Sequence, residues 1–120
     1  MLKKFIAVAV IAAATLCGSG SEANAQAAPI AYDYLTQGFD YATVAFTDFG
    51  TADGYDAYIY AYDAQYFVSA GDYYDAYIFG SYAADSALAD YYATGDGNAY
   101  EAYYLLSVGA LQAYYADIGY

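Results

Sequence analysis

Basic side chains, histidine and cysteine are almost missing from this 120-residue sequence. Lys3 and Lys4 are its only basic residues, Cys17 is its only cysteine, and it has no histidine or tryptophan. From residue 26 onward the chain therefore has no cationic side chain and no thiol for a disulfide. Because recognition of phosphate depends on Lys and Arg, these absences exclude nucleic acid and anionic membrane surfaces as electrostatic partners.

The same absences leave few groups for catalysis. Acid–base and nucleophilic chemistry at neutral pH draws chiefly on His, Cys, Lys, and Ser backed by a base. Pairs of carboxylates are the remaining candidates, but most acids here lie where the capping of a helix explains them. We therefore expect no enzymatic activity, no catalytic residue and no cofactor.

The N-terminal residues have the three parts of a secretory signal. Two lysines precede an apolar run over residues 5–16, and Ala23 and Ala25 occupy the small-residue positions of a cleavage site. The run is too short to cross a bilayer, which takes about 20 residues. We expect a signal peptide over residues 1–25 and an exported protein that works outside the cell, at its surface or in the periplasm. Lipidation at Cys17 stays an open alternative.

The chain from Gln26 onward is acidic and rich in tyrosine. Glu22 is the only one of the 14 acidic residues that precedes the expected cleavage site, so 13 remain, and all 20 tyrosines lie after it. High charge favours disorder, but abundant tyrosine and alanine favour folding. We expect a short leader over residues 26–30, which holds the only proline, and then one tyrosine-rich helical domain over residues 31–120.

Four glycines divide this domain at intervals of 21, 24 and 24 residues. A left-handed glycine commonly ends a helix. A pair of polar residues follows each of the first three glycines, the first able to cap a helix and the second, three positions later, near the positive end of its dipole. The glycines are Gly50, Gly71, Gly95 and Gly119, and the expected caps are Asp53 with Asp56, Asp72 with Asp75, and Asn98 with Glu101.

Similar segments follow these caps, with Tyr-Asp-Ala-Tyr-Ile at positions 55 and 74 and Tyr-Glu-Ala-Tyr-Tyr at position 100. They indicate an internal repeat of one helix per unit. Tyrosine favours strands, but the tyrosines at positions 55, 58, 62 and 66 are separated by 3, 4 and 4 residues, which is helical spacing. We expect an all-α fold of about four antiparallel helices, either a helical-hairpin bundle or a short α-solenoid.

One turn adds a resemblance. The segment Gly71-Asp72-Tyr73-Tyr74-Asp75-Ala76 resembles the turn between the two helices of a tetratricopeptide repeat, where a Gly-Asp-Tyr cluster precedes a small residue of the second helix. The chain departs from that family because it lacks the closing proline and the period of about 34 residues. The resemblance implies stacked helical hairpins or an α-solenoid, without the family's peptide-binding groove.

The acidic turns also offer oxygen ligands to a hard cation such as Ca²⁺. The six capping residues are therefore weak candidate cation sites as well as caps. None of the turns matches the calcium-binding loop of about 12 residues. We expect no firm metal site, and we leave divalent cations such as calcium as an open alternative.

The tyrosines allow four interpretations. They can fill the core, form contacts between copies of the chain, stack on sugar rings or other apolar-faced ligands, or support dityrosine cross-links. The sequence gives no geometry for the last of these. In the final helix, polar side chains other than tyrosine form only a narrow stripe, and one small domain cannot cover so much apolar surface. Other copies of the chain are the simplest cover.

We therefore predict a secreted structural protein that self-assembles through tyrosine-rich helix faces into an extracellular filament, layer or matrix. One of two rows on the last helix is expected to pack inside the subunit and the other to contact a neighbour, head to tail. The contact residues are Tyr100, Tyr103, Tyr104, Leu106, Tyr114 and Tyr115. The alternatives are a binding module for carbohydrate or another apolar-faced ligand, and an acidic protein that binds cations or mineral.

Overall fold

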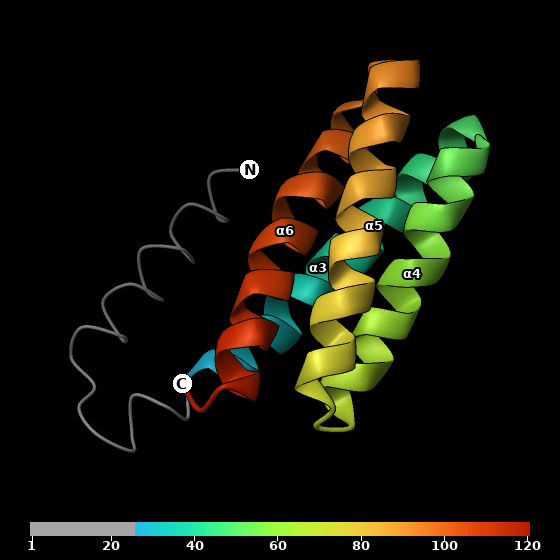
Figure 1. The fold of residues 1–120 in the computed structure, drawn as a ribbon. Helices are drawn as coiled ribbons and strands as arrows, with labels where there is room; N and C mark the ends of the chain where they lie inside the picture. The colour runs from blue at the N-terminus through green and yellow to red at the C-terminus, as the bar shows by residue number, and fades with distance from the viewer. Residues whose placement is uncertain (1–25) are drawn as a thin grey trace.

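The computed structural model describes residues 26–120, which form helices and short turns without any strand (Figure 1). The four helices are α3 (Ala27–Phe49), α4 (Ala52–Ser69), α5 (Tyr73–Thr94) and α6 (Gly97–Asp117). The predicted all-α fold is therefore confirmed. The expected signal peptide over residues 1–25 and the lipidation alternative at Cys17 lie outside the described residues.

Helix α3 begins earlier than the sequence analysis predicts. Its first residue is Ala27, so most of the expected leader over residues 26–30 belongs to the helix, and that prediction is wrong. Pro29 is compatible with this position, because backbone N–H groups in the first turn have no partner within the helix. The helical domain thus begins close to Gln26.

The predicted role of the four glycines is confirmed. Gly50, Gly71, Gly95 and Gly119 all have positive φ, between 64° and 103°. The N–H of Gly50 donates to the carbonyl oxygen of Phe46, and the N–H of Gly95 donates to that of Tyr91, so each satisfies a carbonyl that the helix end would leave unpaired. A left-handed backbone excludes most other residues at these positions.

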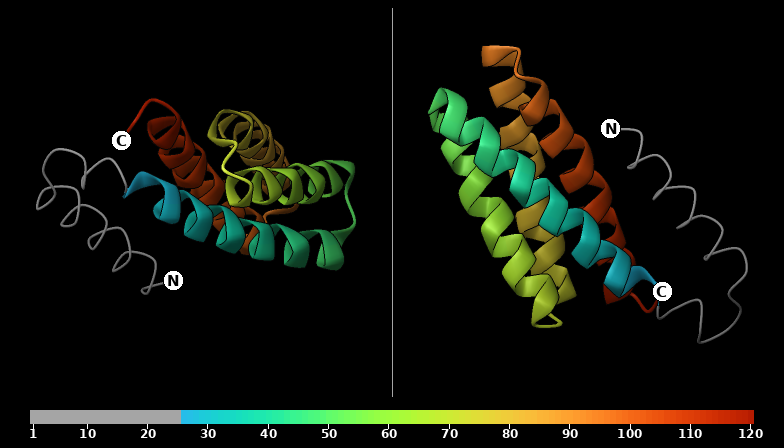
Figure 2. Two further views of the ribbon diagram at one scale, coloured as in Figure 1. Left: turned by 90° about the horizontal axis from the view of Figure 1, so that it is seen from below. Right: turned by 180° about the vertical axis from the view of Figure 1, so that it is seen from behind.

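The helices run alternately up and down, and the chain closes on itself. Each helix packs against its neighbours in sequence, and α3 also packs along α6 (Figures 1 and 2). An open α-solenoid would leave its first and last helices apart, so the bundle is the correct member of the two predicted arrangements. The stacking that the tetratricopeptide-like turn implies is not adopted, and the predicted head-to-tail continuation of an open repeat has no free end on which to build.

Small residues, and not tyrosines, form most of the core. Buried positions are separated by three and four residues along each helix, the spacing of a heptad repeat. On α4 they are Gly54, Ala57, Ala61, Ala64 and Val68. On α5 they include Ala76, Gly80, Ala83, Ala87 and Asp90. Side chains of this size allow the helix backbones to approach closely, which leaves no room for an aromatic ring between them.

Two leucines interlock α3 with α6 in a reciprocal way. A Cβ atom added to Gly38 would lie 2.6 Å from Leu106 Cγ, and one added to Gly109 would lie 2.8 Å from Leu35 Cγ. On both helices the glycine follows the leucine by three residues, so each leucine packs over the glycine of the other helix. This pair of contacts fixes the register between the first and last helices and closes the bundle.

Candidate functional site

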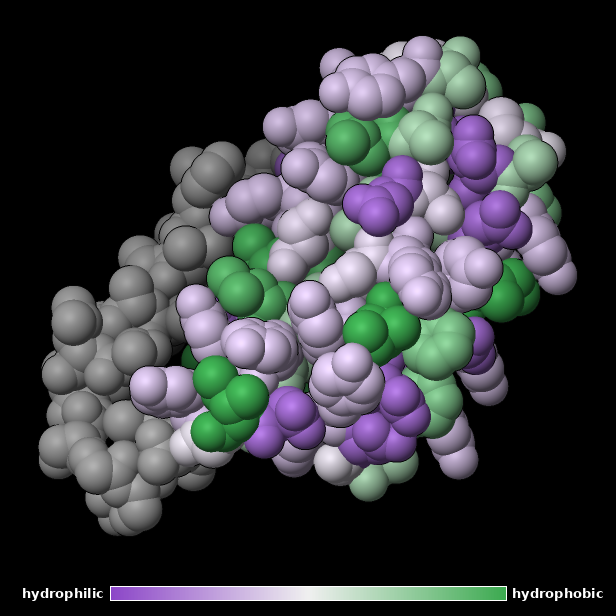
Figure 3. Space-filling model, viewed as in Figure 1, coloured by the Kyte–Doolittle hydropathy of each residue, from purple (hydrophilic) through white to green (hydrophobic). Residues whose placement is uncertain are grey.

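The tyrosines form the outer layer of the bundle. Eleven of the 20 are exposed, and Tyr34 is the only one that is buried. Because the core is filled by alanine, glycine and leucine, rings on neighbouring positions of each helix lie over the seams between helices. On the face shown in Figure 3, strongly hydrophobic residues are separated by weakly and strongly hydrophilic ones. Eleven of the 15 large hydrophobic side chains that are exposed in residues 26–120 are tyrosines, which have a hydroxyl group on the ring.

The first group of rings covers the seam between α3 and α4. Its α3 members are phenylalanines, Phe39 and Phe46, and Tyr58 of α4 stacks on both, with ring centroids 5.6 and 5.8 Å apart. Tyr55 and Tyr62 pack edge-on at the two ends of the group. We call these five residues the α3–α4 cluster.

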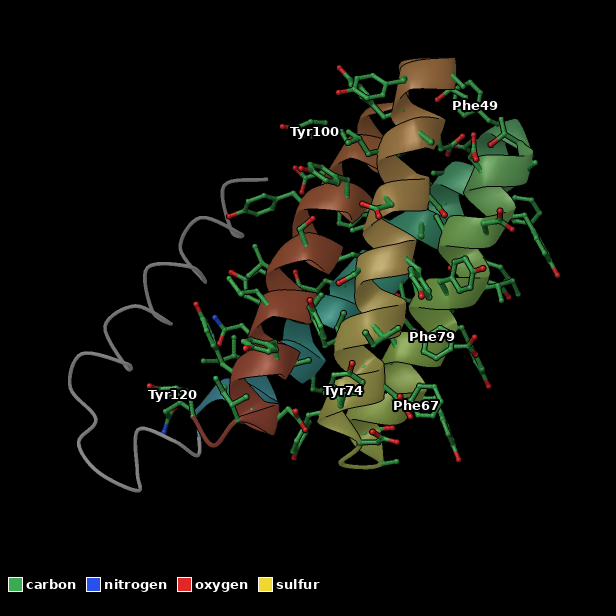
Figure 4. All side chains as sticks on the ribbon, viewed as in Figure 1. Phe49, Phe67, Tyr74, Phe79, Tyr100 and Tyr120 are labelled. Carbon is green, nitrogen blue, oxygen red and sulfur yellow. The ribbon has the colours of Figure 1, made fainter. Side chains whose placement is uncertain are left out.

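The second group covers the seam between α4 and α5. Phe67 of α4 stacks on Phe79 of α5 at 5.3 Å, and Figure 4 shows the two side by side on the same face. Tyr82 contacts both Phe79 and Tyr60, and Tyr66 packs against Phe67. Tyr66 and Tyr82 are 61% and 51% exposed, so over half of each side chain is open to another molecule. We call these residues the α4–α5 cluster.

Two further groups lie at opposite ends of the seam between α5 and α6. Near the turn that joins these helices, Tyr91 contacts Tyr100 at 5.1 Å, with Tyr92 and Tyr103 beside them. At the other end of the bundle, Tyr77 contacts Tyr114 at 5.3 Å. Tyr74, Tyr115 and Tyr120 extend this second group. Figure 4 shows Tyr100 at one end of the molecule and Tyr74 and Tyr120 at the other.

The structure separates the six predicted contact residues of α6. Leu106 is fully buried against Gly38, so its prediction as a contact between copies is wrong. Tyr100 and Tyr103 belong to one of the groups on the α5–α6 seam. Tyr114 and Tyr115 belong to the other, and Tyr104 is half-buried near Tyr34. No tyrosine row of α6 packs inside the subunit, because its buried row consists of small residues and leucine.

Tyr34 is unusual because its hydroxyl is buried without a hydrogen-bond partner. Desolvation by this burial, together with the nearby phenol of Tyr104, raises the pKa of Tyr34. A buried hydroxyl without a partner costs about 1–3 kcal/mol of stability. The ring of Tyr34 therefore stabilises the fold by packing, whereas its hydroxyl adds no stabilising hydrogen bond.

One of the three predicted pairs of capping residues is confirmed. The Asp72 side chain caps α5 by accepting a hydrogen bond from the backbone N–H of Asp75 at 3.3 Å. Three causes raise the pKa of Asp75: the largest is a side-chain hydrogen bond with Asp72, and desolvation and the negative charge of Asp72 add to it. Asp56 and Glu101, predicted to act like Asp75, are each the fifth residue of their helix and lie beyond the first turn, where the dipole acts most strongly.

The caps of α4 and α6 differ from the predicted residues. Thr51 caps α4 in place of Asp53, and Asp96 caps α6 in place of Asn98, so those two predictions are wrong. Each true cap, like Asp72, directly follows the left-handed glycine of the preceding turn. At α4 and α6 the cap therefore lies two residues earlier than predicted, and this adjacency of glycine and cap is the signal that would have located it.

Asp90 is the only charged residue buried among the described residues. The hydroxyl of Thr51 donates to Asp90 Oδ1 at 2.5 Å and accepts from the N–H of Gly54 at 2.8 Å. A carboxylate of α5 is thereby fixed at the positively polarised N-terminus of α4. The arrangement explains Gly54, because a Cβ atom there would lie 3.1 Å from Asp90 Oδ2.

The acidic side chains do not assemble into a metal site within residues 26–120. No three or more His, Cys, Asp or Glu side chains gather there in a way that could hold an ion. The six residues considered as weak cation sites lie at the beginnings of three different helices. None of the described helices combines the length and hydrophobicity needed to cross a membrane.

Comparisons with known proteins give no relative. No family model matches the chain, and neither a curated protein nor a solved structure is similar to it. A function must therefore be inferred from the tyrosine-rich surface itself.

Proposed function

We propose that the protein is an exported structural subunit that assembles with copies of itself, through its exposed tyrosines, into an extracellular filament, layer or matrix. The supporting observation is the arrangement of aromatic rings in groups over three seams of one small bundle. A subunit of a polymer or layer needs contact surfaces on more than one side, whereas a closed dimer needs one.

The exposed tyrosines supply most of the area that two such contacts on one subunit need. Taking about 150–250 Å² for a whole aromatic side chain, the exposed fractions of the 11 tyrosines give about 1,100 Å² of ring surface. A stable protein interface covers about 800 Å² on each partner, and tyrosine is enriched where binding energy concentrates. The exposed aliphatic and phenylalanine side chains add to this area: Val44, Phe49, Leu111 and Ile118.

The hydroxyl groups make these rings compatible with an acidic surface. Thirteen carboxylates follow residue 25 without a basic side chain, so copies of the chain repel one another at neutral pH. A phenol can donate a hydrogen bond to a carboxylate of the neighbouring copy, which lowers the cost of bringing that carboxylate into a contact. Divalent cations that screen the remaining carboxylates would strengthen the same contacts. In this proposal the tyrosines serve assembly, and no catalytic group is required.

The α4–α5 cluster provides the sharpest test, because it holds two of the more exposed tyrosines. Replacing Tyr66 and Tyr82 together by serine removes both rings from the surface and leaves the buried alanines unchanged. At about 1.5 kcal/mol for each ring in a contact, the concentration needed for assembly should rise about a hundredfold. The matched control replaces the same two residues by phenylalanine, which keeps the rings and removes only the hydroxyl groups, so assembly should weaken much less than in the serine variant.

Circular dichroism and light scattering, measured on the same samples, separate assembly from folding. The serine variant should keep its helical signal while its scattering at a given concentration falls. Equal scattering by the serine variant and the unmodified protein would show that this cluster makes no contact between copies. If the unmodified protein does not assemble but its tyrosine fluorescence responds to oligosaccharides, the carbohydrate-binding alternative replaces the structural one.

A further inference from the structure

Three pairs of tyrosines join consecutive helices at short range. Their ring centroids are 5.1 Å apart for Tyr91 and Tyr100, 5.3 Å for Tyr77 and Tyr114, and 5.5 Å for Tyr60 and Tyr82. Contacts between two tyrosines of the same helix are longer, from 5.7 to 6.5 Å. We propose that these three pairs are sites of oxidative dityrosine formation, which links α4 to α5 and α5 to α6 covalently.

Each pair combines an accessible ring with a more protected one. Tyr82, Tyr100 and Tyr114 are 51%, 47% and 38% exposed, while the partner of each is half-buried. The exposed ring can transfer an electron to an oxidant at the surface. The protected partner is held by the core helices, so the two rings stay together until coupling occurs.

The seam between α3 and α4 differs in a way that supports the assignment. There the rings that α3 contributes are Phe39 and Phe46, and phenylalanine lacks the phenol that forms a stable radical. Helix α3 is instead joined to α6 by the reciprocal packing of Leu35 and Leu106 on two glycines. The three short tyrosine pairs therefore lie at the two seams that do not involve α3, between α4 and α5 and between α5 and α6.

The reaction requires a two-electron oxidant, for which we name hydrogen peroxide used by a haem peroxidase. Each tyrosine loses one electron and its phenolic proton and becomes a phenoxyl radical. The two radicals couple through a new bond between ring carbons ortho to oxygen, and transfer of the two ortho hydrogens to oxygen restores both phenols. One peroxide takes up two electrons and two protons and becomes two waters, so the product has lost two hydrogen atoms.

These links would have the stabilising effect that disulfides have in other exported domains. The chain has no cysteine after residue 25, so a carbon–carbon bond between rings is a cross-link available to it. A covalent link between helices limits the conformations of the unfolded chain, and the effect grows with the length of the closed loop. The inference concerns contacts within one chain and does not depend on the proposed assembly.

The test is oxidation of the purified protein in dilute solution with a haem peroxidase and a limiting amount of hydrogen peroxide. Cleavage before aspartate separates the partners of each pair; for example, cuts at Asp90 and Asp96 place Tyr91 and Tyr100 on different peptides. Mass spectrometry should then find the three interhelical peptide pairs, each two hydrogens lighter than its parts, as the main products. The oxidised monomer should melt more than about 10 °C higher than the untreated protein.

Two variants of similar exposure provide the control. Tyr100→Phe keeps the ring contact but should abolish the link to Tyr91 while leaving the other two. Tyr55→Phe changes a tyrosine that is 49% exposed but faces Phe46, and it should leave all three yields unchanged. Main products that lie within single helices or between chains, or an equal loss of all links in both variants, would overturn the proposal.

Discussion

The hydrogen bond between Thr51 and Asp90 should be worth more to the fold than any other single polar contact in residues 26–120. Thr51→Ala removes the N-cap of α4, which costs about 1 kcal/mol. It also removes the hydroxyl that donates to the buried carboxylate, and a hydrogen bond to a charged group contributes about 1.5–3 kcal/mol. The free energy of unfolding should therefore fall by about 3 kcal/mol, and Tm by about 15 °C in a domain of this size.

A double-mutant cycle isolates the contact. Urea unfolding of Thr51→Ala, Asp90→Ala and the combined variant should give a coupling energy of about 2 kcal/mol, because Asp90→Ala removes the hydrogen bond but leaves Thr51 able to cap α4. Thr47→Ala is the matched control, since this exposed threonine donates only to the carbonyl oxygen of Thr43 within its own helix, and its loss should cost less than 0.5 kcal/mol. A coupling energy near zero would show that the hydrogen bond between Thr51 and Asp90 does not stabilise the fold.

Three further predictions concern the packing and the pH dependence of stability. Gly38→Ala should lower the free energy of unfolding by about 1–3 kcal/mol because its Cβ would collide with Leu106, whereas Gly97→Ala, with open space around it, should not; thermal unfolding distinguishes them. The raised pKa of Asp75 means that the folded state binds this proton more readily than the unfolded chain, so the contribution of Asp75 to stability should grow as pH falls through the carboxyl range, and the difference between the pH dependence of Tm in the unmodified protein and in Asp75→Asn should show this growth. The raised pKa of Tyr34 means that the contribution of its protonated phenol to the free energy of unfolding is present below about pH 10 and is lost as pH rises further. Tyr34→Phe should remove this loss in unfolding curves measured at alkaline pH. The same substitution should not lower Tm at neutral pH, because the hydroxyl has no hydrogen-bond partner.

The sequence predicts the helices and their ends well because those depend on local chemistry. A glycine that must be left-handed is visible at Gly50, Gly71 and Gly95 without knowledge of the rest of the chain. The caps were misplaced at α4 and α6 because several polar residues follow each glycine, and only the first of them caps the helix. The turns are therefore located correctly, and only the capping residue within each of these two turns is predicted two positions too late.

The placement of the tyrosines is harder to predict because it depends on how closely the helices approach. Alanines and glycines at heptad spacing are present in the sequence, and they indicate that small side chains form the seams between helices. Because of their size, all the tyrosines except Tyr34 lie outside the buried positions between the helices and cover the seams from the surface. The same dependence on other helices explains why the prediction for Leu106 is wrong, because nothing in the local sequence shows that its side chain packs on Gly38 of α3.

Closure of the bundle depends on contacts between the first and last helices. The repeated segments are equally compatible with an open stack and a closed ring of helices, because each repeat specifies only its own helix and turn. The reciprocal contacts of Leu35 with Gly109 and of Leu106 with Gly38 select the closed form. Because α3 and α6 pack against each other, neither helix offers an open end to a neighbouring molecule. Contacts with other molecules must then use the exposed tyrosines over the seams.

Electron microscopy and light scattering of the purified protein, over a range of concentrations and with or without calcium, test the proposed function most directly. The account predicts filaments, sheets or a growing network above a threshold concentration, with the threshold lowered at reduced pH or by divalent cations as the 13 carboxylates are neutralised or screened. A compact monomer at high concentration under all of these conditions would contradict it.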